Sequence, residues 1–298
     1  MARFKVVGVG GGGINAVNSM INAGIKDVEF ISIDFAPSTS LASKHITLGS
    51  NTEECAKAAD EHGEEILCAL KDADMVIIVA GIGGTTGTSA AQVVAKCSKK
   101  IGAFTFGVVI YPFLCEGDER AERAKNGIND LRNVVDSILV IPSEKLFNNL
   151  DKSTSLIDKF KEIDDIIRHG VQSICDIGNG YSFVGADLDM IKAVIGNNKF
   201  AYVGIGEAAG NNAPLTAFGE AINSPFIEEQ LCEAKGIIVH FIGDASQFNL
   251  LELNETVMNI GNYVHPEANI MWTGVLDDAM GDKVRAIVVA TSQCRDYE

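Results

Sequence analysis

Two glycine-rich stretches have the residue types and the spacing of phosphate-binding loops. Residues 81–89 read GIGGTTGTS, with four Gly, three Thr and one Ser between an apolar run and a segment with helical spacing. Residues 8–13 read GVGGGG and have the G-x-G-x-x-G spacing directly after the first apolar run. Such stretches leave backbone N–H groups and hydroxyls free to face an anion at the start of a helix. They predict that the protein binds a chain of phosphates.

The first stretch alone has alternative interpretations. Asp34 ends the second predicted strand about 20 residues after the glycines, where a ribose-binding acid is expected in a dinucleotide-binding fold. A Rossmann-type oxidoreductase is therefore one alternative, and a glycine turn needed only for tight packing is another. The second stretch favours a polyphosphate, because two loops at neighbouring strand ends can hold phosphates from both sides. With no G-x-x-x-x-G-K-[ST] motif present, backbone amides, two helix N-termini and Mg²⁺ would neutralise the phosphate charge.

The elements that would carry these loops predict an α/β protein with two domains. In residues 1–153 short apolar runs alternate with helical segments, which predicts a parallel, Rossmann-like sheet covered on both faces. Apolar residues then recur with a helical period, which predicts one long central helix within 154–178. Four strands in 179–298 predict a smaller α/β domain with a mixed four-stranded sheet. The other predicted helices are Asn15–Ile25, Glu53–Leu70, Gly87–Ile101, Arg120–Val134, Thr216–Asn223 and Leu250–Val264.

Composition excludes several classes of function. A net charge of −16 argues against a nucleic-acid partner, because phosphate backbones select for Lys and Arg. No run approaches the roughly 18 apolar residues of a membrane span, and the start of the chain does not resemble a signal peptide, so we expect a cytoplasmic protein without direct membrane insertion. The seven Cys are scattered and predict no metal site. We expect His240 to be a strand residue with a hydrogen-bonded ring, and Trp272 to lie in the core or at an interface.

Longer stretches resemble FtsZ, the bacterial relative of tubulin. The similarity covers nearly the whole chain in order, so it implies that family's GTPase-like domain followed by its second domain. The stretches similar to the nucleotide-binding segments are VVGVGGGGINAVNSMI, GIGGTTGTSAAQVVAK, YPFLCEGDERAERAKNGI, VIPSEKLF and DKFKEIDDIIRHGVQSICD. Those similar to the second domain are SPFIEEQLCEAKGIIVHFIG and NIMWTGVLDDAMGDKVRAIVVAT.

Carried over residue by residue, this resemblance implies a site for GTP or GDP. Glu116 and Arg120 would hold ribose and phosphate. Phe160 and Asp164, one helical turn apart, would stack on guanine and hydrogen-bond to it, and Asn15 would also contact the base. Without the resemblance, the same spacing is more typical of a core aromatic residue and a solvated acid. The positions that would surround the phosphates are Gly10, Gly11, Gly12, Gly13, Gly83, Gly84, Thr85, Thr86, Gly87 and Thr88.

Several positions depart from the family pattern and predict weaker phosphate binding. Thr85 and Ser89 replace glycines of the family's GGGTGTG loop, and a Cβ at Thr85 would disfavour a positive φ by about 1 kcal/mol or more. Only Asn51 and Thr52 lie where the family has a further glycine-rich loop over the terminal phosphate. Ser143 stands where the family has Asn beside the base or sugar. Each change removes a contact.

The departure with the largest consequence lies in GNGYSFVGADLDMIKAVIG. In tubulin relatives an N-x-D-x-x-D segment of one molecule positions the attacking water at the nucleotide of the next. Here the Asn falls on Gly185, the first Asp on Asp187 and the second on Met190. Asp189 is one position away, which turns its side chain by about 100° on a helix. Asp187 also has the position of a helix N-cap.

This loss predicts weak or absent GTP hydrolysis, because a water-positioning group commonly contributes about 10²- to 10⁴-fold in rate. The leading hypothesis is a cytoskeletal protein that forms head-to-tail protofilaments with itself and binds guanine nucleotide. Assembly without nucleotide is one form of this hypothesis. The alternatives are an active, assembly-dependent GTPase that uses Asp187 and Asp189, the Rossmann-type oxidoreductase, and a non-polymerising regulator of FtsZ.

Overall fold

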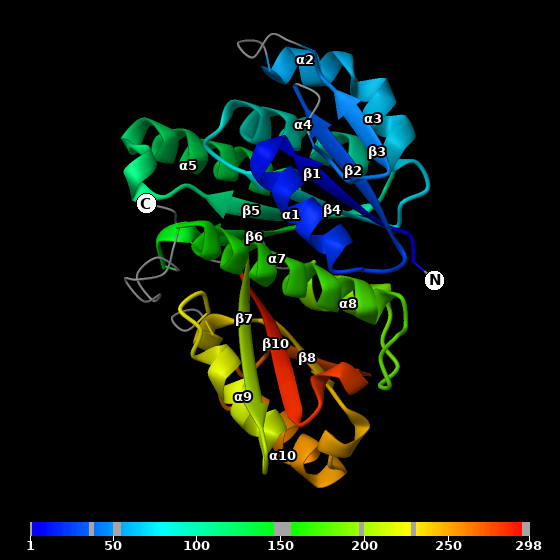
Figure 1. Ribbon diagram of the computed structural model, residues 1–298, viewed down its shortest axis with the longest axis vertical. Coiled ribbons are helices and arrows are strands. Elements are labelled where there is room, and N and C mark those ends of the chain that lie inside the picture. The colour runs from blue at the N-terminus through cyan, green and yellow to red at the C-terminus, as the bar shows by residue number, and fades with distance from the viewer. Residues whose placement is uncertain are drawn as a thin grey trace. The chain divides into compact units, whose positions relative to one another are not determined.

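The chain folds into two compact units, shown together in Figure 1. The computed structural model describes residues 2–35, 39–49, 55–145, 156–196, 200–227 and 231–293. One unit runs from Ala2 to Arg168 and the other from His169 to Asp296, so their boundary falls inside helix α7 (Leu156–Gly178). The division into domains at 1–153, 154–178 and 179–298 stays a prediction.

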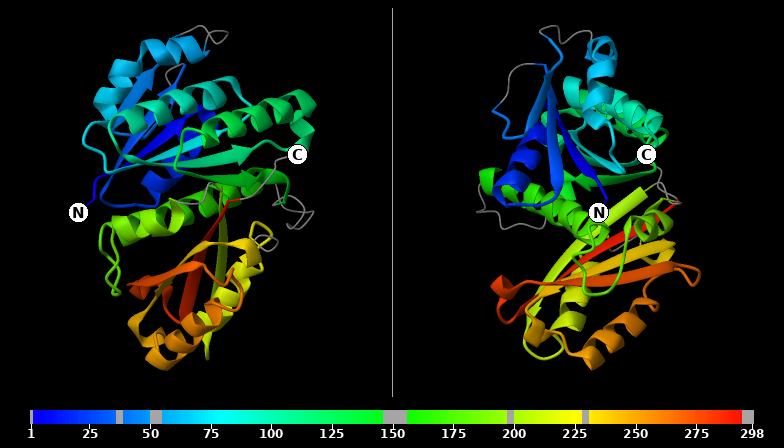
Figure 2. Two further views of the ribbon diagram at one scale, coloured as in Figure 1. Left: turned by 180° about the vertical axis from the view of Figure 1, so that it is seen from behind. Right: turned by 90° about the vertical axis from the view of Figure 1, so that its right-hand side faces the viewer.

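The first unit is built on a parallel sheet, as predicted. Its strands lie in the order β3-β2-β1-β4-β5-β6, every neighbouring pair is parallel, and helices cover both faces (Figure 2). Burial on both faces explains why the strands are continuous apolar runs. The strands are β1 (Phe4–Val9), β2 (Val28–Asp34), β3 (Lys44–Thr47), β4 (Met75–Gly81), β5 (Phe104–Tyr111) and β6 (Ser137–Pro142). The helices are α1 (Gly10–Asn22), α2 (Cys55–Glu61), α3 (Gly63–Leu70), α4 (Thr85–Lys100) and α5 (Asp118–Arg132), with a 3₁₀ turn η2 (Leu114–Glu116).

Helix α1 begins at Gly10, five residues before the predicted start at Asn15. A run of glycines has a low helix propensity, so tertiary packing decides here. A Cβ on Gly13 would lie 2.1 Å from the carbonyl oxygen of Val79 in β4, which means that only glycine lets the helix lie this close to the strand. The segment predicted as one helix, Glu53–Leu70, contains two, α2 and α3. Strand β3 was not predicted, because KHIT is short and half polar.

The second unit contains the predicted mixed four-stranded sheet. Its strands lie in the order β7-β10-β8-β9, with β10 antiparallel to both β7 and β8, and β9 parallel to β8. Helix α9 packs against β7, where a Cβ on Gly204 would lie 2.0 Å from the carbonyl oxygen of Ala221. The strands are β7 (Phe200–Ala209), β8 (Gly236–Gly243), β9 (Asn269–Leu276) and β10 (Lys283–Ser292). The helices are α8 (Leu188–Ile195), α9 (Ala213–Ile222) and α10 (Leu250–Ile260), with 3₁₀ turns η3 (Leu231–Glu233), η4 (Ala245–Gln247) and η5 (Asp278–Met280).

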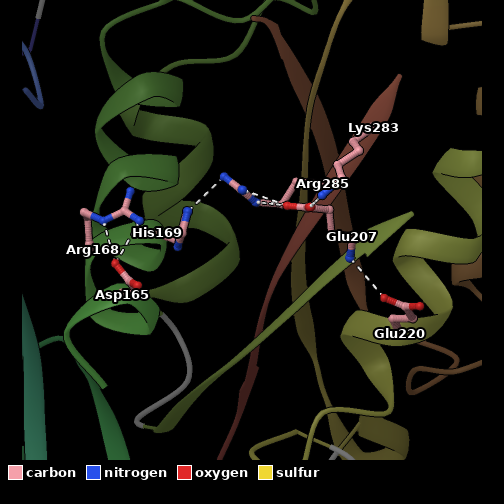
Figure 3. A network of polar contacts seen from close by, with 7 residues as sticks. All are labelled: Asp165, Arg168, His169, Glu207, Glu220, Lys283 and Arg285. Carbon is pink, nitrogen blue, oxygen red and sulfur yellow. Dashed lines mark hydrogen bonds and ion pairs between the residues drawn. The ribbon is translucent and has the colours of Figure 1, made fainter. Parts of the chain in front are cut away.

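A polar network fastens the second half of α7 to this sheet (Figure 3). Arg285 Nη1 lies 2.9 Å from His169 Nε2, and its Nη2 and Nε donate to Glu207 Oε2 at 2.7 and 3.2 Å. Lys283 Nζ donates to the other carboxylate oxygen of Glu207 at 2.7 Å. The hydrogen bonds from Lys283 and Arg285 lower the pKa of Glu207. Because a guanidinium only donates, His169 Nε2 must accept, so the contact requires a neutral ring.

The expectation for the ring of His240 was wrong. His240 lies in β8, but among the described residues neither ring nitrogen has a hydrogen-bond partner, and the side chain is fully buried. The nearest opposite charge is Asp176 on α7, whose Oδ2 lies 3.9 Å from His240 Nε2. Burial lowers the pKa of His240 to about 4 and raises the pKa of Asp176 to about 6.

Within the described ranges, no helix combines the length and apolar character that crossing a bilayer requires.

Candidate functional site

A cavity of about 460 Å³ in the first unit brings several predicted residues together. Its size suits a small organic ligand. Five residues predicted to bind nucleotide line it: Gly12, Asn15, Glu116, Arg120 and Asp164. The other lining residues are Gly81, Ile82, Ile110, Tyr111, Pro112, Phe113, Ser143, Lys161 and Ile163. They include the carboxyl ends of β4 and β5, where ligands bind in parallel α/β sheets.

The two glycine-rich stretches form the N-termini of helices α1 and α4. No side chain caps either helix, since the N-cap residues Val9 and Gly84 make no side-chain hydrogen bond. The first backbone N–H groups of a helix have no partner inside the helix, and the helix dipole favours an anion beside them. Each stretch therefore places the N-terminus of an uncapped helix where an anion could bind, and the phosphate site itself stays a prediction.

The glycines of the first stretch have two different roles. A Cβ on Gly11 would meet no atom within 4 Å, and one on Gly12 would come no closer than 3.5 Å to another residue. Gly10 has a φ of +68°, and its Cβ would lie 3.2 Å from the backbone nitrogen of Gly87 in the second stretch. Gly10 and Gly13 thus allow close packing, Gly11 leaves open space, and Gly12 leaves room for a Cβ in ordinary contact with Gly81. That open space, beside an uncapped helix N-terminus, fits a phosphate.

Hydrogen bonds within the second stretch hold its conformation. Thr88 Oγ1 donates to the carbonyl oxygen of Gly84 at 2.6 Å and accepts from the backbone nitrogen of Gly83 at 2.9 Å. The positive φ, +97°, falls on Gly83, whereas Thr85 is the first residue of α4 and has no positive φ. The predicted backbone strain at Thr85 is therefore wrong. Of this stretch, Gly81 and Ile82 line the cavity, whereas the predicted residues 83–88 are not among its lining residues.

Two cations face the cavity of this acidic protein, Arg120 and Lys161. Arg120 Nε lies 3.1 Å from Glu116 Oε2, and the other oxygen of Glu116 accepts from the backbone nitrogen of Phe113 at 2.8 Å. Arg120 Nη2 also comes within 3.8 Å of the position of a Cβ on Gly84. The guanidinium therefore lies between a carboxylate and the N-terminus of α4, where it can also reach a phosphate.

Among the residues predicted near the base, Asn15 on α1, Asp164 on α7 and Ser143 after β6 line the cavity. Asp164 is half-buried on α7, and burial, with a smaller effect of Asp165, raises its pKa to about 6. Ser143 Oγ donates to the carbonyl oxygen of Tyr111 at 2.6 Å, so its hydroxyl proton is already used. Phe160 lies on α7, but its side chain is outside the described residues.

Comparison with known proteins identifies the family. Residues 38–151 match the description "Tubulin/FtsZ family, GTPase domain", and residues 199–293 match "FtsZ family, C-terminal domain". The structure of an empty FtsZ dimer of M. jannaschii is 32% identical over 98% of this chain and 88% of that chain, with a TM-score of 0.90. The chain belongs to the tubulin/FtsZ family.

Two further structures agree with this assignment. A W319Y mutant of the same FtsZ is 33% identical over 98% of this chain and 91% of that chain, with a TM-score of 0.91. CetZ2 from Haloferax volcanii, in a protofilament bound to GTPγS, is 15% identical over 100% of this chain and 95% of that chain, with a TM-score of 0.84. At that identity the similarity shows the shared fold alone.

The apolar wall of the cavity was not predicted from the sequence of this family member. Ile110, Tyr111, Pro112 and Phe113 continue β5 into the cavity, and Lys161 adds a charge one turn before Asp164. A signal was available, because residues 110–113 follow the apolar run FTFGVV, and ligands in parallel α/β sheets bind at the carboxyl ends of the strands. Among the described residues no cluster of His, Cys, Asp or Glu is suited to hold a metal ion.

The two catalytic candidates lie in the second unit and already have partners. Asp187 is the N-cap of α8, and its Oδ1 accepts from the backbone nitrogen of Met190 at 2.9 Å. Asp189 Oδ1 lies 3.2 Å from Lys192 Nζ, and its side chain is 89% exposed. Met190, which stands where the family has its second Asp, is 44% exposed. The segment thus presents one capping carboxylate and one carboxylate paired with a surface lysine.

Proposed function

We propose that this chain is a cytoskeletal, filament-forming protein that binds GTP or GDP in the first-unit cavity and hydrolyses GTP weakly or not at all. The observation that carries the proposal is the cavity itself, where an uncapped helix N-terminus, open glycines and Arg120 meet a half-buried acid, Asp164. A cytoplasmic location and a role in cell division belong to the same proposal.

Phosphates would lie against the backbone N–H groups at Gly11 and Gly12, with the guanidinium of Arg120 beside them. Mg²⁺ bound through the phosphates would add positive charge that the chain lacks. Asp164 would accept hydrogen bonds from N1–H and the 2-amino group of guanine, which adenine cannot donate. Asn15, a residue of α1 that lines the cavity, would contact the base as well.

Weak hydrolysis is expected from the contacts of residues 185–190, the acidic segment that stands where the family has N-x-D-x-x-D. The carboxylate of Asp187 accepts the hydrogen bond that caps α8, and Asp189 is paired with Lys192. Gly185 and Met190 offer no oxygen or nitrogen in their side chains to orient a water. A water at the nucleotide of a neighbouring copy would therefore meet at most one of the three polar groups that the family pattern provides.

The proposal also includes the head-to-tail assembly of copies of this chain into filaments. The M. jannaschii FtsZ is described as a dimer, and the H. volcanii CetZ2 as a protofilament. A head-to-tail contact is heterologous and forms open filaments. Without rapid hydrolysis such filaments would be long-lived, or would form without nucleotide.

Electron microscopy and sedimentation of the purified protein with no nucleotide, with GDP and with GTP test assembly, and phosphate release tests hydrolysis. We expect filaments that persist in GTP and slow phosphate release that does not rise above the assembly threshold. The double variant Gly185→Asn, Met190→Asp rebuilds the acidic segment and is expected to raise turnover in filaments. The control is Met190→Leu, which keeps an apolar side chain.

The alternatives predict different results. Rapid, concentration-dependent turnover that Asp187→Ala abolishes would favour the active GTPase and contradict weak hydrolysis. NAD(H) retained by the purified protein and not displaced by GTP would favour an oxidoreductase. A protein that sediments as a monomer in all nucleotide conditions would favour a non-polymerising regulator.

A further inference from the structure

Lys161 of α7 lines the first-unit cavity but takes no part in the contacts proposed above. The residue is exposed, so it lies where the cavity opens to solvent. Among the described residues, the other cation of the lining is Arg120, whose Nε lies 3.1 Å from Glu116 Oε2. Arg120 lies beside the N-terminus of α4, because its Nη2 comes within 3.8 Å of the position of a Cβ on Gly84. The phosphates therefore already have a cation near them, and Lys161 is a second cation on a different helix.

Helix α7 places Lys161 next to Asp164. The two residues are three positions apart in one continuous helix, and side chains at this spacing are neighbours, with Cβ atoms about 5–6 Å apart. Both residues line the cavity, so this face of α7 forms part of its wall. A lysine carries its ammonium on a flexible four-carbon stem. A ligand group that contacts the Asp164 carboxylate is therefore within reach of the Lys161 ammonium as well.

The charges of the lining divide into two pairs. Among the described residues the charged members of the lining are Glu116, Arg120, Lys161 and Asp164, which sum to zero from two cations and two carboxylates. Arg120 and Glu116 form one ion pair. Lys161 and Asp164 are the remaining cation and carboxylate, on one face of α7. A base that meets this face meets a hydrogen-bond acceptor and a cationic donor side by side.

The edge of guanine has a matching order of polar groups. The 2-amino group, N1–H and O6 lie next to one another along it. A carboxylate only accepts hydrogen bonds, so Asp164 serves the first two groups and leaves O6 without a partner. An ammonium only donates, and lysine is a common partner of guanine O6. Adenine has an amino group where guanine has O6, and that donor would face the ammonium.

We propose that Lys161 is a specificity-determining residue of the nucleotide site, whose ammonium donates a hydrogen bond to O6 of guanine beside the contacts of Asp164. The contact rests on the proposed function, because it requires a guanine base in the first-unit cavity. Lys161 and Asp164 together serve all three polar groups of the guanine edge. Adenine offers a donor at atom 6 and no proton at N1, so both residues reject it.

The test compares nucleotides that differ in one atom or group of the base, by calorimetry at pH 7 with the full chain. In 6-thio-GDP a sulfur, which is a weak acceptor, replaces O6, while N1–H and the 2-amino group remain. In inosine diphosphate O6 and N1–H remain and the 2-amino group is absent. The variant is Lys161→Met, which keeps an unbranched side chain that favours a helix.

We expect the wild type to bind 6-thio-GDP about five- to tenfold more weakly than GDP. Lys161→Met should bind GDP about five- to tenfold more weakly than the wild type, and it should bind GDP and 6-thio-GDP equally within about twofold. Its preference for GDP over ADP should fall by a similar factor. Inosine diphosphate should lose the same factor relative to GDP in both proteins, because Asp164 is unchanged.

Two further variants are matched controls. Lys161→Arg keeps a donor at this place and should keep the preference for GDP over 6-thio-GDP. Lys96→Met removes an exposed lysine of α4 that is not among the lining residues, and it should change neither the affinity nor the preference by more than about twofold. A purely structural role of Lys161 would weaken all nucleotides alike and leave these ratios unchanged, so the ratios report the contact.

The proposal is overturned if Lys161→Met keeps the preference of the wild type for GDP over 6-thio-GDP, or if the wild type has no such preference. It is also overturned if Lys161→Met weakens GDP much more than GMP, since the ammonium would then contact a phosphate. A wild-type chain that does not bind GDP at about 1 mM would contradict the proposed function together with this contact. GDP binding without the difference at atom 6 would contradict the contact alone.

Discussion

The buried pair of His240 and Asp176 leads to a prediction about the pH dependence of stability. Burial raises the pKa of Asp176 from 3.8 to about 6, so between these values the folded protein holds a proton that the unfolded chain has released. The contribution of Asp176 to stability therefore falls as the pH rises, by about 3 kcal/mol at about 1.4 kcal/mol per pKa unit. Burial lowers the pKa of His240 from 6.5 to about 4, so between these values the unfolded chain holds the extra proton. The contribution of His240 rises with pH by about 3 kcal/mol.

The two contributions nearly cancel in the wild type, and single variants separate them. With His240→Asn only the Asp176 contribution remains, so the free energy of unfolding should fall relative to wild type by about 3 kcal/mol between pH 4 and 6.5. With Asp176→Asn it should rise relative to wild type by a similar amount between pH 4 and 6. The double variant should run parallel to the wild type, which makes it the internal control.

Urea unfolding at pH steps from 4 to 7, followed by the fluorescence of Trp272, measures these slopes. Trp272 is the only Trp and lies in the same unit as the pair. An opposite result is physically meaningful, because the two groups lie 3.9 Å apart. If attraction between the charges outweighed their burial, His240 would keep its proton, Asp176 would keep its charge, and both slopes would change sign. Reversed slopes, or single variants that run parallel to the wild type, would refute the argument from burial.

Three further predictions concern the first-unit cavity and the network of α7. Gly12→Val should weaken GDP binding at least about a hundredfold with little loss of thermal stability, because Gly12 lines the cavity and its Cβ would make only ordinary contact with Gly81. Gly13→Ala should instead destabilise the fold, because its Cβ would lie 2.1 Å from Val79 O. Equal effects of the two variants on GDP binding and on the melting temperature would contradict a binding role for Gly12 and a packing role for Gly13. GDP affinity should fall about tenfold per pH unit below about pH 6 as Asp164 takes up its proton, measured by calorimetry, and constant affinity to pH 5 would contradict the contact with guanine. Arg285→Lys should cost about 1–2 kcal/mol of stability by urea unfolding, because an ammonium cannot hold Glu207 and His169 together, and an unchanged midpoint would contradict this.

The sequence predicted the fold well because its strongest signals are local and repeated. Buried parallel strands are continuous apolar runs, and α7 shows its period over six turns, so both could be predicted from the sequence. The start of α1 could not, because it depends on how closely Gly13 approaches Val79 in a strand more than 60 residues away. The unpaired ring of His240 was missed for the same reason, since a partner for a buried side chain is a matter of three-dimensional packing.

The candidate site was likewise predictable only in part. The phosphate-binding glycines have a spacing that can be read directly, and Arg120 and Asp164 were assigned by family resemblance. The roles of individual glycines were not predictable, because Gly10 and Gly12 look alike in sequence and differ in backbone φ and in what a Cβ would meet. The apolar wall that includes Tyr111 and Phe113 likewise depends on contacts between residues far apart in the sequence.

The structure also explains why Asp189 is a poor substitute for the acid that is missing at position 190. The loop before α8 is fixed to β9, because Ser182 Oγ accepts from the backbone nitrogens of Val184 and Gly274 at 3.1 and 3.2 Å and hydrogen-bonds to Thr273. The adjoining ring of Phe183 lies within 2.6 Å of where a Cβ on Gly274 would be, so the loop and the strand are in close contact.

A loop fixed in this way sets the start of α8. To bring Asp189 to the direction of residue 190, the helix would have to turn by about 100°. That turn would break the N-cap bond of Asp187 and the hydrogen bonds that Ser182 and Phe183 make with Gly274. A new carboxylate at position 190 requires none of these changes, because Met190 is already 44% exposed in the first turn of α8. On the proposed function, turnover depends on the residue at 190 and not on a rearrangement of the loop, so Met190→Asp should raise turnover where Asp189→Glu does not.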